Sequence, residues 1–189
     1  EGMPGAGKTT FINQYTNKEN IIFVPQLQIE EKILSKDSVE TSKQFLFAEQ
    51  EKTEQILALG KQYSEIVIDR TFFTTLAYCY VRSKVNNTQE EYISLLRVYE
   101  GIKHTIIFPT HVIFLDVSIE ESIKRRLSYS EDIRYKNWFD PVFLGYLKEF
   151  YNTELRKFFP EVLSYIDTTD LKVDDVVNKI NEVLCKKEI

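Results

Sequence analysis

The amino-terminal residues of this chain form a motif that few folds can accommodate. Residues 2–9 read G-M-P-G-A-G-K-T and match the phosphate-loop pattern G-x-x-x-x-G-K-[ST] at every fixed position. In this pattern the glycines let backbone N–H groups turn toward phosphate oxygens, the lysine reaches the β- and γ-phosphates, and the hydroxyl serves Mg²⁺. A helix can follow, and its positive end would face the same anion. A glycine-rich turn before a helix is the alternative. We predict a nucleotide site formed by Gly2, Pro4, Gly5, Ala6, Gly7, Lys8, Thr9 and Thr10.

Short apolar runs alternate with longer helical patterns along the rest of the chain, which is typical of an α/β fold with a parallel sheet. Strands are predicted at Ile21–Val24, Ile66–Asp69, Val112–Asp116 and Tyr165–Asp167. Helices are predicted at Thr9–Tyr15, Val39–Leu59, Phe72–Ser83, Gln89–Lys103, Ser118–Leu127, Pro141–Phe158 and Val173–Lys186. Because no linker divides the chain, residues 1–189 are predicted to form one domain. A phosphate loop normally follows a central strand, so we also expect a further strand upstream of Glu1.

Charge and cysteine content narrow the class of protein. The net charge is -5 at pH 7, which argues against a general nucleic-acid binder. No apolar run approaches the roughly 18 residues of a membrane span. Cys79 and Cys185 lie far apart without CxxC spacing and are interpreted as reduced thiols. We therefore expect a cytoplasmic protein that binds a small molecule rather than nucleic acid or a membrane; a homodimer is left open.

A second site signal follows the strand predicted at Ile66–Asp69, where the chain reads Asp69-Arg70-Thr71. A carboxylate at the tip of such a strand can hold Mg²⁺ through water or accept a proton from an attacking hydroxyl. Arg70 can grip a phosphate or orient an acceptor hydroxyl with its planar fork. In the alternative interpretation, Asp69 caps the next helix and Arg70 is its ion-pair partner.

A third signal is a locally basic segment rich in aromatic residues, from which we predict a lid over roughly residues 126–139. Phosphoryl transfer spreads negative charge over the moving group, and mobile arginines on a closing lid can neutralise that charge while excluding water. Arg126 and Arg134 are the preferred candidates because they lie near the two ends of this segment. A solvated helix end with cations at its C-terminus is the alternative.

Three segments resemble the thymidylate kinase and deoxynucleoside kinase superfamily of P-loop kinases: Glu1–Thr10, Val67–Tyr78 and Val112–Glu121. The resemblance covers nearly the whole chain. It implies an ATP–Mg²⁺ phosphotransferase with the three-layer α/β sandwich of P-loop NTPases, a five-stranded parallel sheet of order 2-3-1-4-5 and a mobile lid. Residues 45–48 resemble the L-F-A stretch of thymidylate kinases, which implies that Phe47 stacks on the acceptor base. Residues 166–170 resemble the segment whose backbone flanks adenine in that family.

The chain also departs from the family pattern on the acceptor side. Pro4 stands where thymidylate kinases usually have an acidic residue, and Gln26 stands where a carboxylate is expected. Residues 49–51 read E-Q-E where the pattern supplies an arginine. Since a doubly charged acceptor needs nearby cations, these departures favour a neutral hydroxyl acceptor such as a nucleoside or another small alcohol. Gln50 or Glu51 could then bind the acceptor by hydrogen bonds, or lie on a solvated helix face.

These observations predict a kinase that transfers the γ-phosphate of ATP to a nucleoside or nucleoside monophosphate. Lys8 and Mg²⁺ offset the developing charge, Asp69 is the preferred general base, and Arg70 orients the acceptor. Thr9 would hold the metal ion, with Asp69 or Asp116 acting through water. The alternatives are a nucleotide-binding regulatory ATPase and a kinase for a non-nucleoside alcohol.

Overall fold

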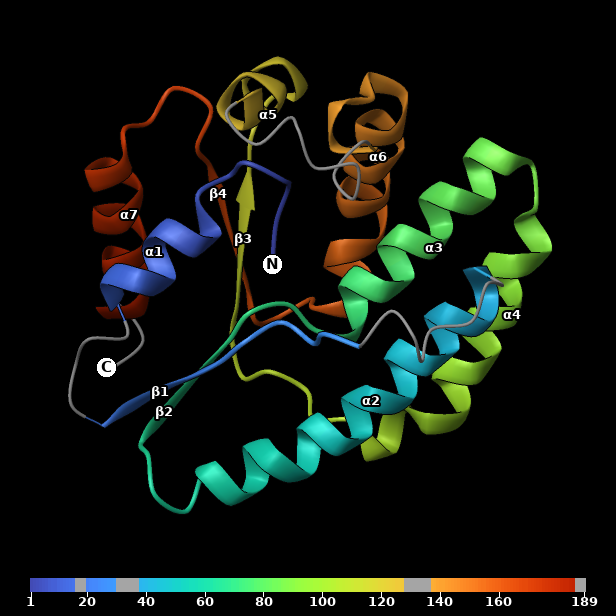
Figure 1. Ribbon diagram of the computed structural model, residues 1–189. Coiled ribbons are helices and arrows are strands. Elements are labelled where there is room, and N and C mark those ends of the chain that lie inside the picture. The colour runs from blue at the N-terminus through green and yellow to red at the C-terminus, as the bar shows by residue number, and fades with distance from the viewer. Residues whose placement is uncertain (16–19, 30–37, 128–136, 186–189) are drawn as a thin grey trace. The chain divides into compact units, whose positions relative to one another are not determined.

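The computed structural model of this chain describes residues 1–15, 20–29, 38–127 and 137–185 (Figure 1). It divides into two compact units, each of which is described by itself. The first unit comprises Glu1–Tyr15 together with Pro109–Ile189, and the second comprises Thr16–Phe108. The prediction of one domain over residues 1–189 stays a prediction.

In the first unit, strands β3 (Val112–Asp116) and β4 (Leu163–Asp167) pair in parallel with Val112 opposite Leu163. The amino-terminal segment Glu1–Met3 runs along the other edge of β3. The backbone N–H of Leu115 donates to Glu1 O at 3.1 Å, and Met3 N donates to Leu115 O at 3.0 Å. Residues 1–3 therefore run beside β3 as they enter the phosphate loop, while the strand expected upstream of Glu1 stays a prediction.

Among its described residues, the first unit also contains the helices α1 (Lys8–Tyr15), α5 (Ile119–Arg126), α6 (Pro141–Phe158) and α7 (Val173–Cys185). Asp140 caps α6, whose first residue is proline, the residue type preferred at that position. The buried face of α6 carries Leu144, Leu147 and Tyr151, and the ring of Tyr151 lies 4.7 Å from that of Phe114 on β3. This aromatic and aliphatic contact anchors α6 on the strand whose far end leads to the candidate site.

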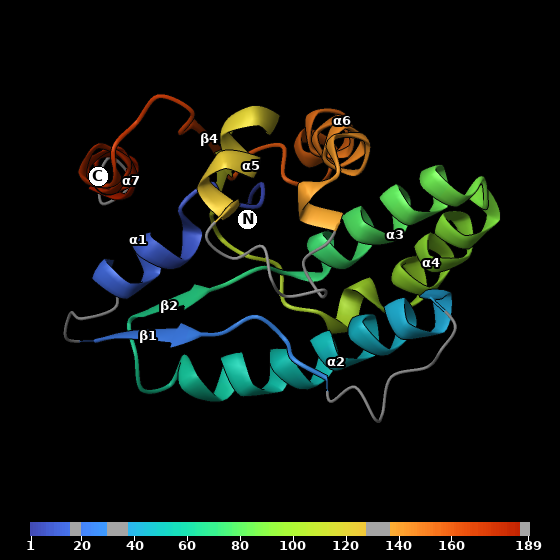
Figure 2. The ribbon, with the colours of Figure 1, turned by 45° about the horizontal axis from the view of Figure 1, so that its top comes forward.

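In the second unit, strands β1 (Ile21–Val24) and β2 (Glu65–Ile68) pair in parallel with Ile21 opposite Glu65. Helices α2 (Ser38–Leu59), α3 (Phe72–Asn86) and α4 (Gln89–Ile102) pack on one another, and the short helix η1 (Lys103–Thr105) follows (Figure 2). The rings of Phe72 and Tyr99 stack 4.8 Å apart in their shared core. α3 ends where Asn87 adopts the left-handed conformation that terminates helices.

The element types agree with the predictions, and the boundaries differ by a few residues. β2 begins at Glu65 and ends before Asp69, β4 begins at Leu163, and α3 continues to Asn86. Among the described residues, β1 pairs with β2 and β3 pairs with β4. Gly2 of the amino-terminal segment forms a parallel bridge to Leu115 on the other edge of β3. These pairings support a parallel α/β fold, while the five-stranded order 2-3-1-4-5 stays a prediction.

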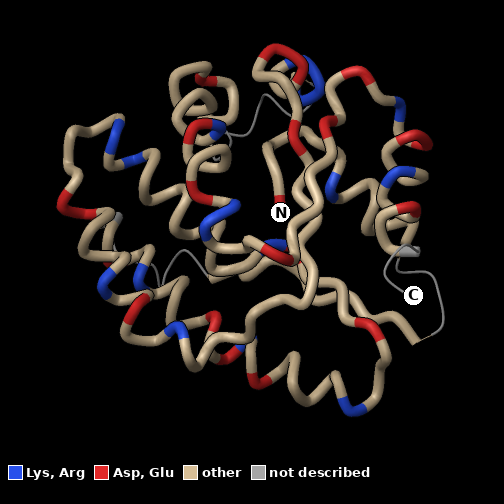
Figure 3. The backbone as a smooth tube through the Cα atoms, turned by 180° about the vertical axis from the view of Figure 1, so that it is seen from behind, with Lys and Arg blue, Asp and Glu red and all other residues tan. Residues whose placement is uncertain are grey.

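Basic and acidic positions are interspersed along the helices (Figure 3), in line with the modest net charge of -5. None of the described helices combines the length and the apolar character that a bilayer span would require.

Candidate active site

The phosphate loop is held against β3 by a close backbone approach at Gly2. The φ angle of Gly2 is +146°, and a Cβ atom there would lie 2.2 Å from the carbonyl oxygen of Leu115. Any side chain at this position would therefore collide with β3. Gly7, with φ of +95°, turns the chain into α1. Glycine is therefore required at position 2 because a side chain would collide with β3, and it is favoured at position 7 because the backbone has a positive φ angle.

Lys8 is the first residue of α1, and its side chain folds back over the loop. Its Nζ donates to the carbonyl oxygens of Gly2 and Met3, both at 2.8 Å. Thr9 and Thr10 follow in the first turn and are exposed. The loop segment thus brings an ammonium group, two hydroxyls and a helix N-terminus together, which is a favourable environment for a phosphate anion.

Helix α5 supports the loop from outside, through two residues that the sequence analysis did not select. The hydroxyl of Ser122, which is fully buried, donates to Pro4 O at 2.7 Å. Arg125 Nη1 donates to Gly5 O at 3.3 Å. Helix α5 therefore stabilises the loop by donating hydrogen bonds to two of its carbonyl oxygens.

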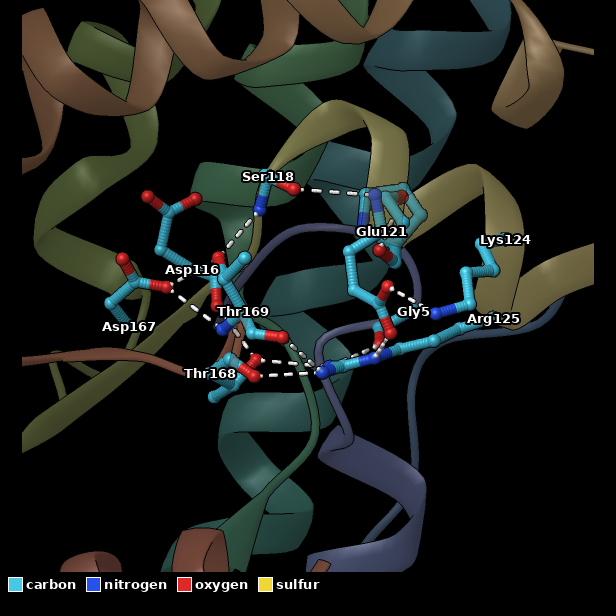
Figure 4. Close-up of polar contacts among 11 residues, drawn as sticks. Gly5, Asp116, Ser118, Glu121, Lys124, Arg125, Asp167, Thr168 and Thr169 are labelled. Carbon is cyan, nitrogen blue, oxygen red and sulfur yellow. Dashed lines mark hydrogen bonds and ion pairs between the residues drawn. The ribbon is translucent and has the colours of Figure 1, made fainter. Parts of the chain in front are cut away.

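Arg125 also ties α5 to the segment that follows β4 (Figure 4). Its Nη2 donates to Thr168 O at 2.7 Å and to Thr169 O at 3.0 Å, while Nε pairs with Glu121 at 2.9 Å. Hydrogen bonds from Arg125 and Lys124 lower the pKa of the Glu121 carboxyl. One guanidinium therefore joins the phosphate loop to the segment that follows β4.

Ser118 caps α5, since its hydroxyl accepts from Glu121 N at 3.2 Å. The reciprocal bond of a capping box is replaced: Ser118 N donates to Thr169 Oγ1 at 2.9 Å, and the Glu121 carboxylate binds Arg125 instead (Figure 4). Thr169 also donates to Asp167 through its backbone N–H and its hydroxyl, and these bonds lower the pKa of the Asp167 carboxyl. The end of β4 is thus fixed by α5.

Asp116, at the end of β3, is buried and engaged by neighbours within the first unit. Its Oδ2 accepts from the Tyr165 hydroxyl and pairs with Lys148 Nζ at 3.0 Å. Burial, and then the hydrogen bond to Asp116, raise the pKa of Tyr165. Among the described residues, none donates to the buried Oδ1. One carboxylate oxygen therefore stabilises the packing of β3, β4 and α6, while the other has acceptor capacity left.

The Asp69-Arg70 motif lies in the second unit, directly after β2. Asp69 N extends the strand pairing by donating to Val24 O at 3.0 Å. Arg70 has a φ angle of +62°, in the left-handed region that is unfavourable for residues with a side chain. The alternative in which Asp69 caps the next helix is wrong, because Thr71 is the N-cap of α3 and accepts from Phe73 N at 3.3 Å.

The turn at Arg70 contacts a buried charged pair on α2 that the sequence analysis missed. Lys52 Nζ donates to Arg70 O at 2.9 Å, and the Lys52 residue is only 3% exposed. Glu49, one helical turn earlier, is 7% exposed and its carboxylate lies 3.9 Å from the Lys52 ammonium. Helical spacing places both on the same face as Leu46 and Ile56, but nothing in the spacing indicates that charged side chains would be buried there.

The remaining predicted site residues have the following surroundings. Phe47, on α2, is 47% exposed, so its ring is available for stacking. Gln50 Nε2 donates to Thr105 Oγ1 at 2.8 Å, which fixes its amide at η1. The guanidinium of Arg126 lies 3.7 Å from the centre of the Trp138 ring. Arg134 and most of the predicted lid lie outside the described residues.

Solved structures with the same fold are kinases of nucleosides and nucleotides. A thymidylate kinase from Candida albicans superposes with a TM-score of 0.77 at 18% identity, covering 100% of this chain and 90% of that one. The fold is that of nucleoside and nucleotide kinases. A deoxyadenosine kinase from M. mycoides, with bound dATP, gives a TM-score of 0.69 at 20% identity and covers 97% and 96% of the two chains. The same enzyme with the products dCMP and dCDP gives 0.71 at 20% identity.

Sequence comparison adds no family to this structural likeness. No protein-family model matches the chain, and no curated protein matches it by sequence. The likeness therefore rests on three-dimensional structure.

The residues at the phosphate loop fit Mg²⁺ of the kind that accompanies ATP. This ion prefers one or two protein oxygens, with the remaining ligands drawn from phosphates and water. Thr9 offers an exposed hydroxyl at the start of α1, and the described residues hold no cluster of three or more metal-binding side chains. A single hydroxyl of this kind suits an ion whose other ligands come from nucleotide phosphates and water.

Proposed function

We propose that this chain is an ATP-dependent kinase that transfers the γ-phosphate to the hydroxyl of a nucleoside or to a nucleoside monophosphate. The observation that carries the proposal is the phosphate loop, held beside β3 with Lys8 folded over it, within the fold of nucleoside and nucleotide kinases. The phosphate-loop pattern supports nucleotide binding, and the likeness of the fold to nucleoside and nucleotide kinases supports phosphoryl transfer as the reaction.

On the donor side, the loop N–H groups and the Lys8 ammonium bind the β- and γ-phosphates. Phosphate oxygens would then become acceptors for the Lys8 donors that now contact Gly2 O and Met3 O. Thr9 would hold Mg²⁺, which when bound offsets the negative charge that builds up on the phosphates. Arg125 keeps the loop and the segment after β4 in register for the nucleotide.

On the acceptor side, Asp69 accepts the proton of the attacking hydroxyl and Arg70 orients the acceptor. Phe47 stacks on the acceptor base, and Gln50 donates to or accepts from its polar edge. Arg126 and Arg134 neutralise the transferring group. The exposed ring of Phe47 and the placement of Asp69 immediately after β2 support these roles.

We further propose that a neutral acceptor is preferred over a monophosphate. Residues 49–51 supply no cation after Phe47, and the nearby Lys52 ammonium is already engaged by Arg70 O and Glu49. A dianionic acceptor would therefore lose hydration without gaining charged partners from this part of α2, which is unfavourable.

The proposal is tested by following ADP release from ATP with a panel of nucleosides, nucleoside monophosphates and non-nucleoside alcohols, with the Lys8→Ala variant as control. At least one nucleoside should raise the rate of ADP release by orders of magnitude, and the variant should not respond. ATP binding with slow, acceptor-independent ADP release would instead identify a regulatory ATPase. Stimulation by a non-nucleoside alcohol alone would change the substrate class.

A further inference from the structure

The backbone of Arg70 has an unfavourable conformation at a position where the proposed chemistry requires accuracy. Its φ of +62° is one of three positive values among the described non-glycine residues, and the other two belong to asparagine. Asparagine tolerates this region through its short polar side chain, whereas arginine does not. A residue held in such a conformation needs surrounding contacts that keep it there.

Lys52 supplies such a contact from α2. Its ammonium donates to Arg70 O at 2.9 Å, from a position that is almost completely shielded from water. A hydrogen bond to a charged donor is stronger than one between neutral groups, and shielding strengthens it further. This hydrogen bond fixes the orientation of the peptide group that links Arg70 to Thr71, the N-cap of α3.

The Glu49–Lys52 pair is poorly explained by stability alone. Burying two charges is unfavourable, and apolar residues of similar size often serve equally well in a protein interior. The carboxylate and ammonium of this pair are 3.9 Å apart, longer than the 2.9 Å between Lys52 and Arg70 O. The shorter contact is therefore the one that the geometry favours.

We propose that Lys52 is a positioning residue: by binding the carbonyl oxygen of Arg70, it holds this turn in its left-handed conformation and sets the directions of the Asp69 and Arg70 side chains. This inference rests on the proposed kinase function. In that reaction, a displacement of about 1 Å at the reacting groups lowers the rate roughly 100-fold.

The kinetic test separates positioning from folding. Lys52→Met alone would also remove the ammonium that faces the buried Glu49 carboxylate, so the informative comparison is Glu49→Gln against the double variant Glu49→Gln/Lys52→Met. Using the acceptor identified in the panel, we expect the double variant to lose about 100-fold in kcat relative to Glu49→Gln, with little change in the KM for ATP. Lys52→Arg, which keeps a cationic donor, should retain most of the activity.

Thr53→Val is the matched structural control. Thr53 is also buried on α2, but it accepts from Ile107 N at 2.8 Å rather than contacting the turn. The control should lower the thermal midpoint as the double variant does, while leaving kcat per folded molecule near that of the wild type. A double variant whose kcat equals that of Glu49→Gln would overturn the proposal.

A second measurement keeps the inference testable when no acceptor is found, which would refute the proposed function rather than this inference. Glycine adopts the left-handed conformation without penalty, so Arg70→Gly removes the need for support. The urea midpoint should fall when Lys52→Met is added to Glu49→Gln. This fall should be smaller when the protein also carries Arg70→Gly than when residue 70 is arginine. Equal drops in both backgrounds would show that Lys52 does not support this turn.

Discussion

The phosphate loop in the first unit lies beside strand β3 and the Asp69-Arg70 turn in the second follows strand β2, yet different forces hold them. The loop is fixed chiefly by backbone bonds to β3 and by a glycine that admits no side chain. The turn is held in a left-handed conformation and contacts a buried ammonium from α2. A loop held by its backbone can be predicted from the sequence, because it requires glycines at fixed spacing. A turn held by a side chain from a distant helix has no such sequence pattern.

The Gly2→Ala substitution tests the backbone support of the phosphate loop and has the largest expected effect. A methyl group placed 2.2 Å from Leu115 O must displace β3 or the loop, so we expect a loss of about 4 kcal/mol or more in the free energy of unfolding. Gly145→Ala on α6 is the matched control, because nothing lies within 4 Å of the added carbon. It should stabilise the protein by roughly 0.5–1 kcal/mol. Urea unfolding of the two variants checks both values, and equal effects would contradict the account.

Lys8→Ala tests the donor side without changing the backbone. We expect about a 1000-fold loss in the rate of phosphoryl transfer with every acceptor, since a charged donor to the developing phosphate charge is removed. Steady-state kinetics with two different acceptors measure this loss. A large loss with one acceptor and a small one with the other would place Lys8 on the acceptor side.

Asp69→Asn tests the acceptor side. Removing a general base lowers kcat by about 100-fold or more, while the affinity for a non-hydrolysable ATP analogue should stay unchanged. Rapid kinetics and calorimetric titration give the two values. Weakened binding of the analogue with unaltered kcat would instead assign Asp69 to metal or nucleotide binding.

Arg125→Met should have an intermediate effect. The variant loses the bonds to Gly5 O, Thr168 O and Thr169 O, which are part-buried, and a buried carbonyl left without a donor costs about 1–3 kcal/mol at most. We expect a lower thermal midpoint and weaker ATP binding. Lys124→Met is the control, since this neighbouring lysine is exposed and pairs only with Glu121 in the bonds described above. Identical behaviour of the two variants would contradict a role for Arg125 in holding the loop.

The smallest expected effect concerns the pH dependence at Asp167. Its pKa is lowered by the bonds from Thr169, so the carboxylate stabilises the fold above the unfolded pKa of about 4, and this contribution disappears as the pH falls through the lower folded pKa. The difference in urea midpoint between wild type and Asp167→Asn should therefore be full near pH 6 and vanish in strong acid. Thr169→Ser keeps the hydroxyl and should behave as wild type. A difference that grows on acidification would contradict this assignment.

The sequence predicted the elements and the phosphate loop because both depend on local patterns. Apolar runs predicted β1 and β3 to the residue, and glycine spacing predicted the loop. The helix predicted at Ser118–Leu127 is found as α5, with Ser118 as its cap. The sequence could not indicate that Arg125, rather than Arg126, binds the phosphate loop. Both arginines lie at the end of the same helix, and only the tertiary fold determines which carbonyl oxygens each can reach.

The burial of Glu49 and Lys52 could not be predicted for a different reason. Charged residues on a helix of a globular protein usually face solvent, on the side opposite its apolar residues. Here two charges share the buried face with Leu46 and Ile56. Departures of this kind from the hydrophobic pattern tend to occur at functional sites, and α2 is the helix that carries the proposed acceptor residues Phe47 and Gln50.

Analysis of the products tests the central proposal most directly. The protein is incubated with ATP and the nucleoside that most stimulates ADP release, and phosphorus NMR follows the fate of the γ-phosphate. The account predicts one nucleoside monophosphate for each ADP formed, with neither product appearing in the Lys8→Ala variant. ADP accompanied only by inorganic phosphate, with the nucleoside unchanged, would contradict it.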